Sequence, residues 1–196
     1  MIALLKNSFI VSKHTVILSV LIVLMPFVGT TVKILSIAFM LLNGLRVCYY
    51  TDHLNNSYYV YFTIPLKKAA LINEKYIYMF IFLVLNMTAL LIASVYTNMD
   101  ITYENIFLLT EKLMLIFCVG GFYIAANLVF GPAKCEFVMI TISICIGLIY
   151  TRLGLYKSAL FKNYLRLDNY LFVFVLIFIS AIIYYVNCII ITRKQL

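Results

Sequence analysis

The residues best able to do chemistry gather in one polar stretch, residues 51–76, of a chain that is otherwise mostly apolar. The stretch holds a carboxylate at Asp52, paired asparagines at Asn55 and Asn56, a proline at Pro65 and three lysines. This mixture of charged and hydrogen-bonding groups suits contact with a partner in water. We interpret the stretch as the main exposed segment of the protein.

Sequence patterns for catalysis are missing from the chain. A phosphate-binding loop needs two glycines five residues apart, followed by Lys and Ser or Thr, and none of the seven glycines has this spacing. The HExxH motif is absent, and the two histidines are His14 and His53. The five cysteines form no CxxC pair, so we expect free thiols that behave as small apolar residues. We therefore expect no enzyme active site, metal or cofactor in this chain.

The composition places the protein in a membrane. Of the 196 residues, 65% are hydrophobic and 11% are charged, whereas soluble domains are about 25% charged and about half apolar. A net charge of +8 fits basic residues that flank membrane spans on the cytoplasmic side. We do not expect a nucleic-acid partner.

Six apolar runs are predicted to cross the membrane, which needs about 20 residues rising 1.5 Å each. The expected spans are 15–32, 34–50, 76–97, 113–133, 137–156 and 169–192, the fifth having the shortest uncharged run. The runs are continuous rather than alternating, which favours helices over a barrel. Residues 1–14 predict an amphipathic interfacial helix or, alternatively, a frayed terminus. The expected fold class is an all-α, polytopic membrane bundle with a single domain over 1–196.

The distribution of Lys and Arg predicts that both termini are cytoplasmic. With this orientation, the cytoplasmic segments hold nine basic residues and the outer segments hold six. Four of those six lie between the fifth and sixth spans, against the usual bias. Either that connection is functionally basic, or the span count is wrong there.

Uncharged polar residues lie within the predicted spans. Asn43, Asn86 and Asn127 are candidates for lining a pathway, and with Asn187 they could instead form hydrogen bonds between helices. Gly121 and Ala125 are separated by three residues, a spacing that permits close helix packing. No carboxylate or lysine lies in the middle of a predicted span, so the spans themselves give no sign of an ion-driven carrier.

The polar stretch resembles permease subunits of type-2 ABC exporters. Small bacterial members carry an acidic, Asn-rich patch after the second span, then a Leu-Pro-x-Ser-Arg-Lys-type turn, then Lys-Tyr entering the third span. The matching residues here are Asp52, Asn55 and Asn56 in the patch, Ile64, Pro65, Leu66, Lys67 and Lys68 in the turn, and Lys75 with Tyr76. Lys67 stands where Ser is usual, and Lys68 where Arg is usual.

The resemblance implies that residues 51–75 include a cytoplasmic coupling helix that docks on a separate ATPase subunit. Pro65 suits the first turn of such a helix, where its missing N–H is not needed; the alternative is a solvated loop. The resemblance further implies ATP and Mg²⁺ on the ATPase, a dimer with a second or homologous permease, and a bacterial plasma membrane.

The family resemblance also suggests a cargo, because similar small permeases often export amphipathic or antimicrobial peptides of the phenol-soluble-modulin type. Two alternatives stay open on the sequence. One is a non-transporting membrane immunity or assembly factor, and the other is a membrane enzyme with a polar cluster that faces a cavity.

Overall fold

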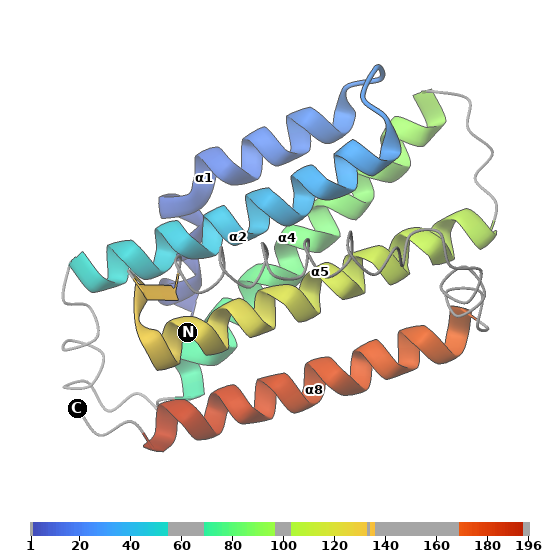
Figure 1. Cartoon of the computed structure of the whole chain (residues 1–196). Helices are drawn as coiled ribbons and strands as arrows, with labels where there is room; N and C mark the ends of the chain where they lie inside the picture. The colour runs from blue at the N-terminus through green and yellow to red at the C-terminus, as the bar shows by residue number, and fades with distance from the viewer. Residues whose placement is uncertain (1, 55–68, 97–102, 133, 136–168, 194–196) are drawn as a thin grey trace, which may run out of the picture.

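Five long α-helices form the described part of this computed structural model, which comprises residues 2–54, 69–96, 103–132, 134–135 and 169–193. They are α1 (Ile2–Leu24), α2 (Thr30–Leu54), α4 (Ala69–Tyr96), α5 (Tyr103–Phe130) and α8 (Asn169–Arg193). Each contains a segment of 20 to 28 residues that is long and apolar enough to cross a membrane. Figure 1 shows these helices packed lengthwise into one bundle.

The all-helical bundle is confirmed for the residues that the structure describes. Four predicted spans, 34–50, 76–97, 113–133 and 169–192, fall largely within α2, α4, α5 and α8. The predicted fifth span, 137–156, lies outside the described residues. Among the described residues, five candidate spans are therefore found, whereas six were expected over the whole chain.

The start of the chain differs from the prediction. We expected an interfacial helix over 1–14 and a span over 15–32, but one continuous helix runs from Ile2 to Leu24. The helix ends before Pro26, which cannot donate a backbone hydrogen bond and disfavours helix in the residue before it. Lys33, expected between two spans, lies in α2, where its side chain is buried and its N–H donates to the Gly29 carbonyl at 3.1 Å.

Contacts along the helices fix their directions. Ser8 and Ser19 of α1 bond to Glu74 and Asn86 of α4, so these two helices run in the same direction. Helix α2 runs against both, and its last turns lie beside the first turns of α1 and α4 (Figure 1).

Helices α5 and α8 also run in the same direction. The Cys118 thiol bonds to the Leu176 carbonyl, and three residues further on the Gly121 carbonyl accepts a bond from Asn187. The ends of both helices therefore lie at the end of the bundle where α2 ends and α4 begins (Figure 1). Gly131 ends α5 with a φ of 79°, and its N–H bonds to the Asn127 carbonyl at 2.9 Å, a common helix ending.

Helix α4 lies at the centre of the bundle and packs on all four other helices. Tyr78, Met79 and Phe82 on this helix are fully buried. A side chain at Gly44 of α2 would collide with the Tyr78 hydroxyl group, and one at Gly120 of α5 would meet the Met79 sulfur at 2.5 Å. These glycines therefore let α2 and α5 approach α4 closely.

Candidate functional site

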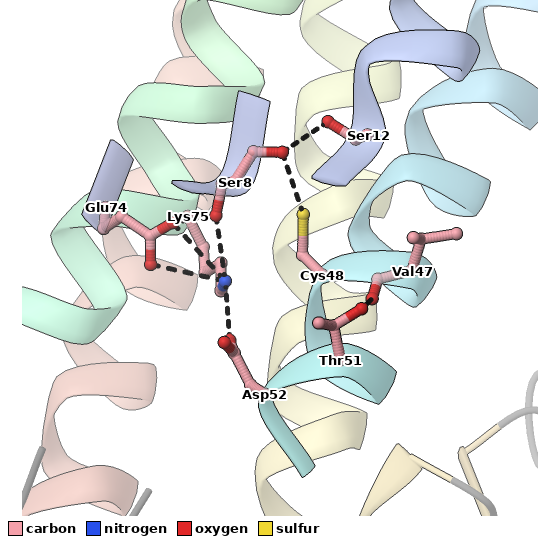
Figure 2. Close-up of polar contacts among 8 residues, drawn as sticks. All are labelled: Ser8, Ser12, Val47, Cys48, Thr51, Asp52, Glu74 and Lys75. Atoms are coloured by element: carbon pink, nitrogen blue, oxygen red, sulfur yellow. Dashed lines mark hydrogen bonds and ion pairs between the residues drawn. The ribbon is translucent and has the colours of Figure 1, made fainter. Parts of the chain in front are cut away.

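A buried cluster of charged groups lies where α2 ends and where α1 and α4 begin. The Lys75 ammonium nitrogen is 3.0 Å from Asp52 Oδ2, 3.3 Å from Glu74 Oε2 and 3.3 Å from Ser8 Oγ. An ammonium group has three N–H donors, so each can meet an acceptor. Figure 2 shows Lys75 between the carboxylates of α2 and α4, with Ser8 of α1 beside it.

Further bonds attach α1 to this charged cluster (Ser8, Asp52, Glu74 and Lys75). The Ser8 hydroxyl group donates to Glu74 Oε1, so Ser8 accepts from Lys75 and donates to Glu74. The Ser8 carbonyl oxygen accepts from Ser12 Oγ at 2.7 Å and from the Cys48 thiol of α2 at 3.6 Å (Figure 2). The start of α1 is thus bonded to both α2 and α4.

The cluster combines two carboxylates with one ammonium group, which gives these three groups a formal net charge of −1. Asp52 is 7% exposed, Glu74 is 3% exposed and Lys75 is 4% exposed. Buried charges require a partner, because an isolated ion away from water is very costly. The Tyr49 ring also faces the ammonium, with its centroid 5.3 Å from Lys75 Nζ, a cation–π distance.

The space beside the cluster is small. A cavity of about 10 Å³ opens next to Lys75, which is room for about one water molecule. Its walls come from all the packed helices except α1, through Tyr49, Asp52, Leu71, Ile72, Lys75, Leu128 and Ile191. A cavity of this size is too small to hold a substrate.

A comparison with protein-family models assigns nearly the whole chain to one family. The model described as "ABC-2 family transporter protein" matches residues 2–194. The chain belongs to the ABC-2 transporter family. A search of the curated proteins found no significant match, and neither did a search of the solved structures.

Membership of the ABC-2 family makes the protein a transporter component of the membrane, in agreement with the resemblance read from the polar stretch. Of the predicted ATPase-coupling residues, the structure places Asp52, which lies in the charged cluster rather than on a free surface. The others, Asn55, Asn56, Ile64, Pro65, Leu66, Lys67 and Lys68, lie outside the described residues. The structure also shows that residues 69–75, expected in the coupling segment, are the first turns of α4.

The candidate pathway residues of this ABC-2 protein occupy different environments. Asn86 is fully buried, accepts from Ser19 Oγ of α1 at 2.7 Å and donates to the Phe82 carbonyl at 2.9 Å. Asn127 is buried and donates to a carbonyl of its own helix, whereas Asn43 is half-buried. Asn86 therefore makes the interhelical bond that was the alternative to a pathway role, and a pathway lined by these three residues stays a prediction.

Sequence reasoning did not single out Ser8, Glu74 or Lys75 as one site. A signal for this site was present in α1. It consists of four hydroxyl residues, all buried in the structure: Ser8, Ser12, Thr15 and Ser19. Their spacing of four, three and four residues places the hydroxyl groups on one helical face. A polar face on an apolar helix predicts a polar neighbour, and that neighbour is α4.

Proposed function

We propose that the chain is the permease subunit of an ATP-driven exporter, with a translocation path formed by its spans and its energy supplied by a separate ATPase subunit. The family match over residues 2–194 carries this proposal. The sequence adds that no phosphate-binding loop is present, so ATP and Mg²⁺ would bind to the partner.

The coupling contact in this proposal is the segment 51–75, centred on Pro65, Lys67 and Lys68. The charged cluster supports this placement, because it lies at both ends of that segment, at Asp52 and at Lys75. Because the two ends of the docking segment are bonded to each other, a movement of the segment would be transmitted to α2 and α4 together and would not separate its ends.

Six membrane crossings fit the helix directions better than five. Helices α5 and α8 run in the same direction, as the pairs Cys118–Leu176 and Gly121–Asn187 establish. Two consecutive spans of equal direction need an odd number of crossings between them. The predicted span over 137–156 would supply one, which supports its inclusion in the proposal.

The proposed orientation places the charged cluster at the cytoplasmic end, together with both termini. Basic residues gather at this end among the described residues, including Lys6 near the start of α1, Lys134 after the end of α5, and Arg193 at the end of α8. Such residues favour the cytoplasmic side. We propose a bacterial plasma membrane as the location.

The proposed assembly is a dimer of two permeases, identical or homologous, with ATPases on the cytoplasmic side. The proposed cargo is an amphipathic peptide or a similar molecule, on the strength of the family resemblance of residues 51–76. A small amphipathic peptide could pass between lipid-immersed helices without the charged mid-span groups that ion carriers use.

Co-expression with a neighbouring ATPase gene tests the proposed function. We expect the ATPase to co-purify with the tagged permease from detergent-solubilised membranes. Replacing Pro65 by Ala together with Lys67 by Glu should reduce the recovered ATPase at least about tenfold, because it removes the helix-starting residue and reverses a charge. The matched control is Lys13→Glu, a charge reversal at an exposed position of α1.

Two results would count against this proposal. One is no association of the wild-type chain with the ATPase, which would favour a non-transporting immunity or assembly factor. The other is equal recovery of the ATPase with the Pro65 and Lys67 variant, which would place the docking surface elsewhere.

A further inference from the structure

We propose that Lys75 is the positioning residue that joins both ends of the coupling segment to α1, so that a push on the segment moves α1, α2 and α4 together. This inference rests on the proposed function for the source of the push. It assigns a role to Ser8, Glu74 and Lys75. It also gives Asp52, which was matched to the acidic patch of the family, a role in pairing with Lys75 inside the bundle.

The Asp52–Lys75 ion pair joins the end of α2 to the start of α4. Asp52 is two residues before the end of α2, and Lys75 is six residues after the start of α4. The two residues are 23 positions apart in sequence, yet their charged groups are 3.0 Å apart. The ion pair therefore holds the two ends of the proposed docking segment next to each other.

Lys75 and Glu74 also connect α4 to α1. The ammonium of Lys75 reaches Ser8 Oγ at 3.3 Å, and the Ser8 hydroxyl group also bonds to Glu74. A second bond between the same helices, from Ser19 to Asn86, lies 11 residues further along α1, or about 16 Å at 1.5 Å per residue. Two bonds this far apart resist both sliding and tilting of α1 on α4.

One charged group, the Lys75 ammonium, contacts both carboxylates of the cluster. Among the described residues, neither Asp52 nor Glu74 forms an ion pair with any other cation. Removing that ammonium leaves two buried carboxylates that repel each other. Removing either carboxylate leaves an intact pair. Lys75 is therefore the residue on which the connection between the three helices depends.

Hydrogen–deuterium exchange tests the connection without any ATPase. In lipid nanodiscs, Lys75→Met should raise exchange at least about tenfold in peptides covering 5–12 and 47–54, where cooperative protection is lost. Peptides from α5 should change less than about twofold. The matched control is Lys33→Met, which removes another buried lysine of the same bundle. Unchanged exchange at 5–12 in Lys75→Met would overturn the inference.

A distance measurement in the permease–ATPase complex tests the positioning role. Spin labels replace Ile10 of α1 and Phe122 of α5, both exposed, and the probe is ATP with vanadate. In the wild type and in Lys33→Met, the nucleotide should change the distance between the labels. In Lys75→Met complexes that retain the ATPase, most of the distance change should be lost. Lys75→Arg, which keeps the charge, should retain it.

The outcomes separate the two proposals. A full distance change in Lys75→Met overturns the positioning role, even with the ATPase docked. Failure of the wild type to bind any ATPase overturns the proposed function and the transmission of a push, while the exchange result still decides whether Lys75 connects the helices. If Lys75→Met does not accumulate in membranes, the triple variant Asp52→Asn, Glu74→Gln and Lys75→Met, which carries no uncompensated charge, is measured against the same expectations.

Discussion

Lys75 lies near the start of α4 and forms both ion pairs of the charged cluster. In the structure it is 4% exposed and shared by two carboxylates. The pairing of Asp52 with Lys75 joins positions 23 residues apart, and no local spacing rule relates residues so distant. The charges were visible in the sequence, but their contact depends on how α2 and α4 pack.

The ratio of two carboxylates to one ammonium predicts an order of stability among substitutions. Lys75→Met should lower the free energy of unfolding by about 3–5 kcal/mol, because it leaves uncompensated buried charge. Asp52→Asn and Glu74→Gln should each cost about 1–2 kcal/mol, because one ion pair remains. Unfolding in mixed detergent micelles with increasing SDS measures these differences.

The decisive comparison for this order is the triple variant in which all three groups are neutral. It should be more stable than Lys75→Met alone, although it contains two more substitutions, because neutral groups cost less to bury than an unpaired charge. Equal stability of Lys75→Met and Asp52→Asn would contradict the charge balance described for the cluster.

At the scale of helices, the sequence predicted most of the elements and misplaced several of their ends. Long apolar runs gave α2, α4, α5 and α8, because about 20 apolar residues suffice to define a span. The boundary of α1 was missed because Pro26 and Gly29 were read as parts of a span, whereas the chain turns there. Glu74 and Lys75 were placed in the coupling segment ahead of the third span, whereas they lie inside α4 and are buried. Their burial depends on partners on α1 and α2, which the sequence of α4 does not show.

Close packing of α2 on α4 makes Gly44 a specific test of the helix arrangement. A Cβ atom at this position would collide with the Tyr78 hydroxyl group and lie 3.2 Å from Thr15 Oγ1. Gly44→Ala should therefore destabilise the protein by about 1–3 kcal/mol through overpacking, despite the better helix propensity of Ala. The SDS unfolding midpoint of the purified protein measures this loss.

A second substitution should restore the stability lost in Gly44→Ala. Tyr78→Phe removes the colliding hydroxyl group, which is buried and has no hydrogen-bond partner among the described residues. The double variant should match or exceed the wild type. Gly29→Ala, at a site with nothing within 4 Å, is the control and should change little. A double variant no more stable than Gly44→Ala would contradict this packing of α2 on α4.

The hydrogen bonds of two buried asparagines show what the sequence could and could not predict about contacts between helices. Asn86 bonds to α1 through Ser19, and Asn187 bonds to Tyr76 of α4 at 2.9 Å and to the Gly121 carbonyl of α5 at 3.2 Å. That buried asparagines join helices follows from the cost of unsatisfied polar groups in lipid. Which helices they join does not follow, because facing positions are fixed only when the bundle is assembled.

At the scale of the whole molecule, the structure shows the direction in which each described helix runs through the bundle. The ends of α2, α5 and α8 and the starts of α1 and α4 lie at one end, where the charged cluster also lies (Figure 1). In the proposed exporter, the ATPase would act on the helices at this end. The family match establishes the class of the protein, and in our proposal the charged cluster would transmit movement of the docking segment to three helices.

Site-specific photo-crosslinking tests this account most directly. A photoreactive amino acid is placed at Ser57, within the proposed coupling segment, in cells that also produce the neighbouring ATPase. The matched position is Tyr96, which is exposed at the opposite end of α4. The account predicts that, on illumination, the Ser57 variant forms a covalent adduct with the ATPase and the Tyr96 variant forms none. An adduct from Tyr96, or none from Ser57 when both variants are produced equally and the ATPase is present, would contradict it.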